Sequence, residues 1–216
     1  MRIIGIILLV LLSAQPALSA DVRVVDGDTL IVSDNRYRLH GIDTPEHGQK
    51  CKKANGGSWR CGSAATKALQ AIVAGKSVKC DNRGIDDYGR IIAVCIADGI
   101  NINETLIRDG FAWAFTKFSR DYVALEQGAR DRKSGIWQAD TETPWAFRAK
   151  RWEVGEQTSP EGCPIKGNIS KNGMIYHAPW SPWYSRTKIS LNKGERWFCS
   201  EKEALEAGWR APLWGG

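Results

Sequence analysis

The stretch Val25–Glu46, VDGDTLIVSDNRYRLHGIDTPE, decides the fold and contains the residues best suited to chemistry. Its β-prone residues alternate with turn residues, which predicts short strands joined by tight turns. Three carboxylates, Asp28, Asp43 and Glu46, fall at the ends of these strands, and Arg38 lies between them. Carboxylates clustered at strand ends beside a fixed cation suit a hard metal ion and a phosphate ester better than they suit a core.

The first twenty residues have the features of a secretory signal peptide. Arg2 precedes an apolar run, Ile3–Leu12, and small residues follow at positions 17–20, which predicts cleavage after Ser19 or Ala20. An uncleaved anchor is the alternative, but the apolar run is short for a bilayer. We predict an exported protein, periplasmic or secreted, with no stable membrane span after cleavage.

Length and charge narrow the class of protein further. The chain has 216 residues, enough for one domain of ordinary size and a small second one. Its formal net charge is +6 and its pI is near 9.0. A basic exported protein favours an anionic partner, which leaves nucleic acid, an acidic polysaccharide or a membrane surface.

We expect residues 21–152 to form a mainly β domain with about three helices. Five short strands are expected at Val22–Val25, Leu30–Val32, Tyr37–Ile42, Ser77–Cys80 and Ile91–Ala97, the last two joined by a polar turn, Asp81–Arg90. Helical signals occupy Ser63–Ala74, Asn103–Asp109 and Asp121–Lys133, and a further short helix is expected from about Pro144. Five strands in a meander, with helices after the third and fifth, are typical of a partly open barrel of the OB type.

The last part of the chain is predicted to be separate. Residues 153–162 include the polar run EQTSPEG, which is typical of a linker. Residues 163–216 form a small module with five of the ten tryptophans, at positions 180, 183, 197, 209 and 214. These tryptophans could form a compact core, or Trp180 and Trp183 could form an exposed platform for sugar rings or bases.

The six cysteines fit an oxidising compartment, in which thiols pair. An even number on each side of the linker favours disulfides closed within each part: Cys51, Cys61, Cys80 and Cys95 before it, Cys163 and Cys199 after it. A Cys51–Cys61 bridge would close a flexible loop, and Cys80 and Cys95 lie on neighbouring predicted strands. For the last pair a disulfide is favoured over a zinc site with His177, which lacks a clear fourth ligand. The sequence alone does not prove the connectivity.

The carboxylates and arginines suggest hydrolysis of a phosphodiester. Asp28 and Asp43 could share a Ca²⁺ with water and the carbonyl of Thr44, and Glu46 is placed to act as a general base on water. Two further cations, Arg38 and Arg90, could neutralise charge at a five-coordinate phosphorus. Turns also use Asp, Gly, Thr and Pro, so DGDT alone is equally compatible with an ordinary turn.

Five motifs occur in order over residues 22–137: VVDGDTLIV, YRLHGIDTPE, DDYGR, INETLIRDGFA and GIW. In these motifs and in their order the chain resembles the staphylococcal nuclease (thermonuclease) family. The resemblance implies Ca²⁺-dependent hydrolysis of the P–O5′ bond of DNA or RNA, leaving 3′-phosphates. It implies Ca²⁺ ligands at Asp28, Asp43 and Thr44, a general base at Glu46, and phosphate contacts at Arg38 and Arg90.

Three features depart from the founding member of that family. The segment after Glu46, HGQKCKKANGGSWRCG, is unlike its short lysine-bearing loop and supplies substrate-binding candidates at Lys50, Lys52 and Lys53. Its two nucleotide-stacking tyrosines have no clear counterparts, and the neighbouring candidates here are Phe115, Phe118 and Tyr122. Asp87 stands where the founding member has a lysine.

Two other classes of function remain as alternatives. A non-catalytic nucleic-acid-binding barrel would use a basic groove with stacking aromatics and would need no acid cluster. A cell-envelope or exopolysaccharide-associated protein would have its function in the tail, which could bind an envelope component or nucleic acid. We assume a monomer.

Overall fold

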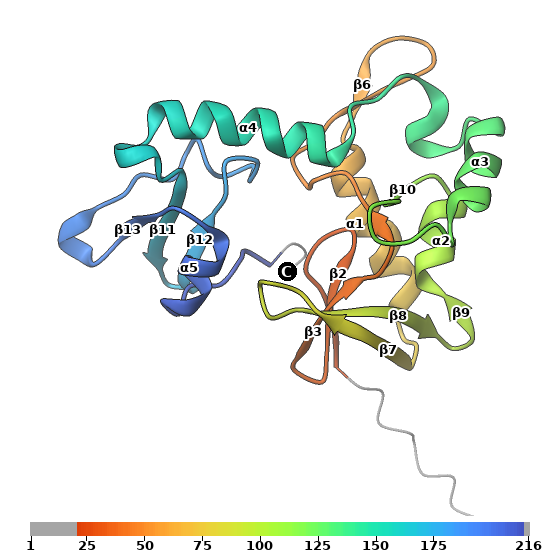
Figure 1. The fold of residues 1–216 in the computed structure, drawn as a ribbon, viewed down its shortest axis with the longest axis horizontal. Helices are drawn as coiled ribbons and strands as arrows, with labels where there is room; N and C mark the ends of the chain where they lie inside the picture. Colours follow the sequence, from red (N-terminus) through yellow and green to blue (C-terminus); the bar gives the residue numbers. More distant parts are fainter. Residues whose placement is uncertain (1–20, 214–216) are drawn as a thin grey trace, which may run out of the picture.

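The computed structural model of the protein describes residues 21–213. The predicted signal peptide, residues 1–20, lies outside the described residues, as does Trp214. Figure 1 shows a larger lobe, built from the chain up to Gln138, and a smaller lobe built from residues 163–213. The helix α4 (Pro144–Thr158) runs along one side of both lobes and joins them.

The larger lobe contains a curled sheet whose strands follow the order β1-β2-β3-β8-β7. Their bounds are β1 Val22–Val24, β2 Thr29–Val32, β3 Asn35–Leu39, β8 Ile91–Ala97 and β7 Val78–Ile85; β9 (Ile100–Asn101) pairs with β8. Neighbouring strands are antiparallel except β3 and β8, which are parallel. A hairpin cannot join a parallel pair, so the chain leaves the sheet after β3 through α1 (Cys61–Val73).

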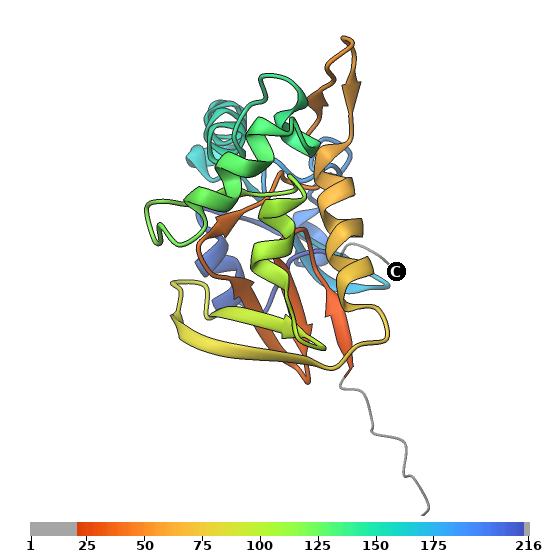
Figure 2. The ribbon, with the colours of Figure 1, turned by 90° about the vertical axis from the view of Figure 1, so that its right-hand side faces the viewer.

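Three helices cover one face of this sheet. Figure 2 shows α1 beside α2 (Ile102–Arg108), and α3 (Val123–Asp131) packs on α2. Ala65, Leu69 and Val73 of α1 are buried, which is the helical period predicted from the sequence. Ala93, Cys95 and Ala97 of β8 are fully buried, since alternate residues of a strand face the same side.

The fourth predicted strand is longer than expected and its turn is shorter. Residues 81–85, predicted as part of a polar turn, continue β7 to Ile85, so only Asp86–Arg90 form the turn. The side chains from Asn82 to Ile85 are exposed because β7 is an edge strand. Within the sheet, the backbone of β7 makes its hydrogen bonds to β8 alone. Apolar and polar residues do not alternate in this segment, so its sequence does not indicate a strand.

The third predicted strand, Tyr37–Ile42, breaks at Gly41, whose φ of +70° lies in the left-handed region. Beyond the break, β4 (Ile42–Asp43) pairs with β10 (Trp113–Ala114) instead of the main sheet. A second short pair, β5 (Cys51–Lys52) with β6 (Ser58–Trp59), forms a projecting hairpin. The 3₁₀ turn η1 (Gly135–Gln138) closes the lobe.

The segment predicted as a linker is mostly helical. α4 begins at Pro144 after the capping residue Thr143 and continues to Thr158, and a 3₁₀ turn, η2 (Pro160–Gly162), follows it. Most of residues 153–162, predicted to be a linker, is therefore helical. The helix continues because Gly155 packs closely against Pro164 and Pro179, contacts that local composition does not reveal.

The smaller lobe has a three-stranded sheet in the order β12-β11-β13. Its elements are β11 Ile165–Ser170, β12 Gly173–His177, η3 Leu191–Lys193, β13 Arg196–Phe198 and α5 Glu201–Glu206. Its core contains Ile165, Tyr176, Phe198, Ala204 and Trp209, and Trp152 of α4 packs against it. Trp209 is thus a core residue, whereas Trp180 is only partly buried.

All six cysteines form disulfides, paired as Cys51–Cys61, Cys80–Cys95 and Cys163–Cys199. Each bridge is closed within one part of the chain, as the even counts predicted. Across residues 21–213, no helix has the length and apolar character needed to span a membrane.

Candidate active site

Two buried carboxylates form the centre of the site. Asp28 comes just before β2 and Asp43 ends β4, and both side chains are nearly inaccessible to solvent. Asp28 Oδ2 accepts hydrogen bonds from the Thr44 backbone N–H at 2.9 Å and from Thr44 Oγ1 at 3.1 Å. The DGDT and DTPE motifs therefore meet in space although they are sixteen residues apart.

The close approach of these motifs explains the glycine of DGDT. A Cβ at Gly27 would overlap Thr44 Oγ1 and crowd Ala65 of α1. A side chain at position 27 would push Thr44 away from Asp28. The hydrogen bonds from Thr44 to Asp28 therefore depend on a glycine in this turn.

Glu46 is held by a loop that folds back on itself. Gln49, which is buried, accepts a hydrogen bond from the Glu46 backbone N–H at 3.1 Å, and its own N–H donates to the Glu46 carbonyl at 2.7 Å. Gln49 Nε2 also donates to the Glu142 carbonyl at 2.6 Å. A Cβ at Gly62, at the start of α1, would overlap the Glu46 carbonyl. The loop is therefore tightly packed, and Gln49 is a positioning residue that the sequence did not reveal.

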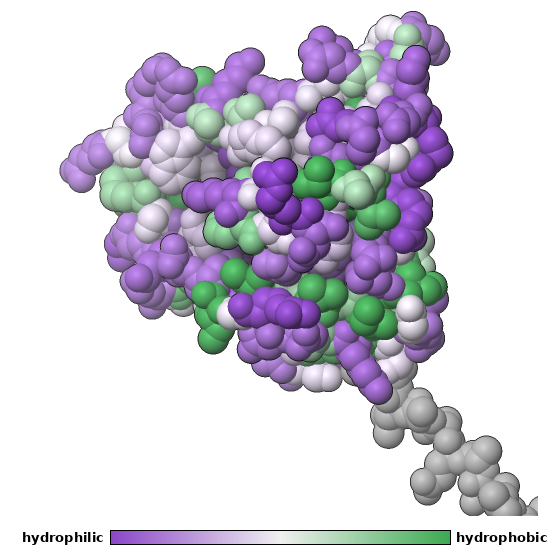
Figure 3. Space-filling model, turned by 45° about the vertical axis from the view of Figure 1, so that its right-hand side comes forward, coloured by the Kyte–Doolittle hydropathy of each residue, from purple (hydrophilic) through white to green (hydrophobic). Residues whose placement is uncertain are grey.

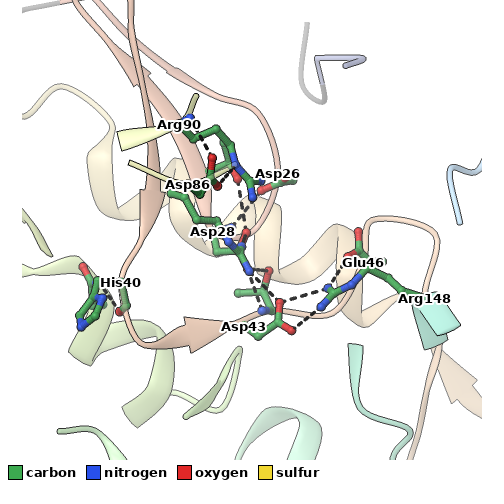
Figure 4. A network of polar contacts seen from close by, with 12 residues as sticks. Asp26, Asp28, His40, Asp43, Glu46, Asp86, Arg90 and Arg148 are labelled. Atoms are coloured by element: carbon green, nitrogen blue, oxygen red, sulfur yellow. Dashed lines mark hydrogen bonds and ion pairs between the residues drawn. The ribbon is translucent and has the colours of Figure 1, made fainter. Parts of the chain in front are cut away.

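The two predicted arginines have different partners. Arg38 forms ion pairs with Asp28 and with Asp43, the latter at 2.8 Å. Arg90 Nε donates to Asp86 Oδ2 at 2.6 Å, and Asp86 Oδ1 accepts from the Arg90 backbone N–H at 2.9 Å. Asp86, the first residue of DDYGR, thus orients Arg90 toward the acids (Figure 4).

Arg148 of α4 is a third site arginine that the sequence analysis missed. Its Nη2 donates to Asp43 Oδ2 at 2.8 Å and its Nη1 donates to Glu46 Oε1 at 2.7 Å (Figure 4). Although burial lowers its pKa, the carboxylates of Asp43 and Glu46 raise it above the ordinary arginine value. The only signal was its place in a basic, tryptophan-bearing helix after the last family motif.

The pKa of the Glu46 carboxyl lies near neutral pH. Burial raises the pKa of its carboxyl to about 7, against the opposing effect of Arg148. A carboxyl with a pKa near neutrality can take a proton from water and release it again, which suits a general base.

One cavity of about 800 Å³ is lined by Asp28, Arg38, Glu46, Arg90 and Arg148. Asp43, which is completely buried, is paired with Arg38 and Arg148. Phe115 and Phe118 also line the cavity, whereas Lys50, Lys52 and Lys53 are exposed on or beside the β5–β6 hairpin and do not. Tyr122 is a core residue, 5% exposed, with its ring beneath Gly41. Its ring has no open face for a base, so Tyr122 is not retained as a substrate-binding candidate.

The donor set suits a hard cation. Asp28 and Asp43 offer carboxylate oxygens and Thr44 a backbone carbonyl, the ligand types that Ca²⁺ prefers. Within residues 21–213, no group of three or more His, Cys, Asp or Glu side chains is arranged as a metal site. A cation here would therefore depend on two carboxylates completed by the carbonyl and by water. Arg38 and Arg148 show that these buried acids require nearby positive charge.

The protein has a curled barrel in which acids and arginines meet at one cavity. This arrangement is expected of an enzyme that hydrolyses phosphate esters. A family model described as "Staphylococcal nuclease homologue" matches residues 36–139, and one described as "ArfC" matches residues 149–211.

Similar proteins are found among bacteria. An uncharacterized endonuclease of Escherichia coli is 37% identical over 157 residues, covering 67% of this chain and 96% of that protein. The succinoglycan biosynthesis protein ExoI of Rhizobium meliloti is 34% identical over 158 residues, covering 69% of this chain and 83% of that protein. The micrococcal nuclease of Shigella flexneri is 30% identical over 145 residues, covering 59% of this chain and 78% of that protein.

The chain belongs to the staphylococcal nuclease family. This confirms the family resemblance, the OB-type barrel and the nuclease class predicted from the sequence.

Proposed function

We propose that this protein is an exported, Ca²⁺-dependent nuclease that hydrolyses phosphodiester bonds of DNA or RNA and leaves 3′-phosphate ends. The observation that carries the proposal is that Asp28, Glu46, Arg38 and Arg90 line one cavity, with the buried Asp43 paired to Arg38. A signal peptide at residues 1–20, a nuclease domain over residues 21–152 and a separate module over residues 163–216 remain part of it. Three disulfides support export, since they form in oxidising compartments.

Asp28, Asp43 and the Thr44 carbonyl would hold the Ca²⁺. When bound, such an ion polarises the phosphate and stabilises the charge that develops on its oxygens. Arg38 and Arg90 would donate to the same oxygens, for which their planar guanidinium groups are suited.

Glu46 would take a proton from the attacking water. The new bond forms between the water oxygen and phosphorus, and the P–O5′ bond breaks. The 5′-oxygen leaves and gains a proton, and the phosphate stays on the 3′-oxygen. Within the cavity, Gln49 keeps the Glu46 backbone in place and Asp86 keeps Arg90 in place.

The test is cleavage of single-stranded DNA by the purified chain, with Ca²⁺ or with chelator, beside Glu46→Gln. We expect cleavage that depends on Ca²⁺, is lost in the variant, and gives ends that a polymerase extends only after phosphatase treatment. Folded protein that binds DNA but cleaves nothing with any divalent metal would favour a non-catalytic binding barrel.

The relative named as a succinoglycan biosynthesis protein supports a second candidate, a role in exopolysaccharide production that depends on the tail. Expression of Glu46→Gln in a strain that lacks the protein separates the two. Full restoration of polysaccharide output by this variant would place the function outside the catalytic cluster.

A further inference from the structure

The smaller lobe forms the second wall of the catalytic cavity. The lining includes Asp28, Arg38, Glu46 and Arg90 from the barrel, and on the opposite side Tyr176, Trp180, Pro182, Glu201 and Pro212. Residues more than 130 positions apart in the chain thus face the same space. The smaller lobe therefore contributes side chains to the cavity that holds the candidate catalytic residues.

Direct contacts hold this wall against the loop that bears Glu46. A Cβ at Gly48 would lie 3.4 Å from both the Trp180 carbonyl and Pro182 Cγ, so the loop and the lobe are in contact. On the other side, Gly155 of α4 packs against Pro179. Arg148, on the same helix, bonds Asp43 and Glu46. The wall is therefore anchored to the catalytic residues through α4.

Two tryptophans give this wall an aromatic surface. The rings of Trp152 and Trp180 lie 5.9 Å apart at an interplanar angle of 33°, and both residues line the cavity while remaining partly exposed. Trp152 Nε1 is bonded to Glu156, and Trp152 also packs on the core of the lobe, which fixes its ring. Bases stack on fixed aromatic rings of this kind whatever their sequence.

The cavity contains arginines that can contact phosphates. Its lining has five arginines, at positions 36, 38, 83, 90 and 148, beside six carboxylates, at positions 26, 28, 46, 86, 87 and 201. Arg36 Nε is buried with no hydrogen-bond partner among the described residues. The lining carboxylate Asp86 is paired with Arg90, and Glu201 accepts a hydrogen bond from Tyr176. Figure 3 shows hydrophilic side chains over most of one face of the molecule, with apolar groups scattered between them.

Stacking on Trp180 requires a base with a free face. In an intact duplex each base is paired and stacked between its neighbours inside the helix, whereas the bases of a single strand can be splayed out onto an aromatic side chain.

We propose that Trp180, supported by Trp152, forms a base-stacking subsite in the second wall, and that this subsite makes the enzyme prefer single-stranded nucleic acid. The proposal rests on the nuclease function proposed above. The phosphate lies toward the arginines of the barrel, and an unpaired neighbouring base stacks on the tryptophan of the smaller lobe.

The test uses the full chain carrying Glu46→Gln, so that binding is measured without cleavage. A fluorescent oligothymidylate is titrated and its anisotropy recorded, beside a duplex of the same length. Trp180→Leu keeps an apolar side chain but removes the aromatic ring, and Trp180→Phe restores a ring. Trp197→Ala is the matched control, because Trp197 belongs to the same lobe but lies over Lys166, outside the cavity.

We expect Trp180→Leu to weaken single-strand binding by about 5- to 100-fold, the effect of one lost base stack. The single-strand affinity of Trp180→Phe should be close to that of the parent, and that of Trp197→Ala should be unchanged. Duplex binding should be weak in all of them. A Trp180→Leu affinity equal to that of the parent would overturn the subsite. Crosslinking of an oligonucleotide carrying 5-iodouracil offers a second measurement: attachment within residues 176–183 supports the proposal, and attachment only to Phe115 or Phe118 contradicts it.

The outcomes separate the two proposals. If the chain with Glu46 intact cleaves nothing while single-strand binding still depends on Trp180, the nuclease function fails and the subsite stands. If Ca²⁺-dependent cleavage occurs and Trp180→Leu has the wild-type KM for single strands, the function stands and the subsite fails.

Discussion

Arg148 Nη2 donates to Asp43 Oδ2 over 2.8 Å, and this bond joins a helix outside the barrel to a buried acid of the site. Asp43 is completely buried, and its other cationic partner is Arg38. The two guanidinium groups together compensate a carboxylate that could not be buried alone.

Replacing Arg148 should therefore remove positive charge that compensates the carboxylates of Asp43 and Glu46. We expect Arg148→Ala to lower the free energy of unfolding by about 1.5–3 kcal/mol in chelator, because charged hydrogen bonds to Asp43 and Glu46 are lost. Added Ca²⁺ should recover more stability in this variant than in the wild type, since the ion supplies the missing charge. Thermal unfolding with and without Ca²⁺ measures both effects; an equal Ca²⁺ response in the two proteins would contradict the argument.

Glu46→Gln should reduce kcat by about 10²- to 10⁴-fold, because the amide cannot accept the proton of water. Calcium binding should remain, since Glu46 is not among the proposed ligands. Glu153→Gln, on the exposed face of α4, is the matched control and should have wild-type kcat. Loss of activity accompanied by loss of Ca²⁺ binding would instead assign Glu46 to the metal.

Arg90→Ala should lower kcat/KM by about 10²- to 10³-fold if its guanidinium stabilises the transition state. Asp86→Asn keeps that guanidinium but weakens its orienting ion pair, so we expect a smaller loss. Arg108→Ala, whose side chain is exposed on α2, should have no effect. Steady-state kinetics on one oligonucleotide gives the three values. An Asp86→Asn enzyme with wild-type kcat/KM would show that the turn alone orients Arg90.

Asp28→Asn should weaken Ca²⁺ binding at least about tenfold, because it removes one of only two carboxylate ligands. Isothermal titration calorimetry measures this without reference to activity. Asp34→Asn, at a nearly fully exposed side chain in the turn after β2, provides the control. Normal affinity in Asp28→Asn would place the ion elsewhere.

His177 predicts a pH dependence of stability. Burial and then the Lys166 ammonium lower the pKa of His177 to about 4, from 6.5. Between these pH values the unfolded chain binds a proton that the folded chain does not. The free energy of unfolding should therefore fall as the pH decreases from about 6.5 to 4, by about 3 kcal/mol at most. Urea unfolding at pH 7 and pH 4.5 should show a smaller difference for His177→Gln; an unchanged difference would assign the pH dependence to other groups.

Much of the barrel and its acid cluster could be predicted because the information is local. Strand alternation, turn residues and motif spacing all occur within short stretches such as Val25–Glu46, and the helical period of α1 is visible in the same way. The three disulfide pairs agreed with the parity of cysteines in each part of the chain. Where the local signal was weak, as in the polar edge strand β7, the predicted turn was too long, because residues 81–85 belong to the strand.

The sequence by itself determined the family and the barrel, and it supplied the five side chains proposed for the chemistry, because each lies in a motif with a recognisable local pattern. Only the tertiary structure decided that Arg148 joins the acids, that Tyr122 is core, and that Trp180 lines the same cavity as Glu46. These relationships depend on how α4 continues through the expected linker and packs at Gly155. Contacts between residues a hundred positions apart are set by packing, which no local pattern encodes.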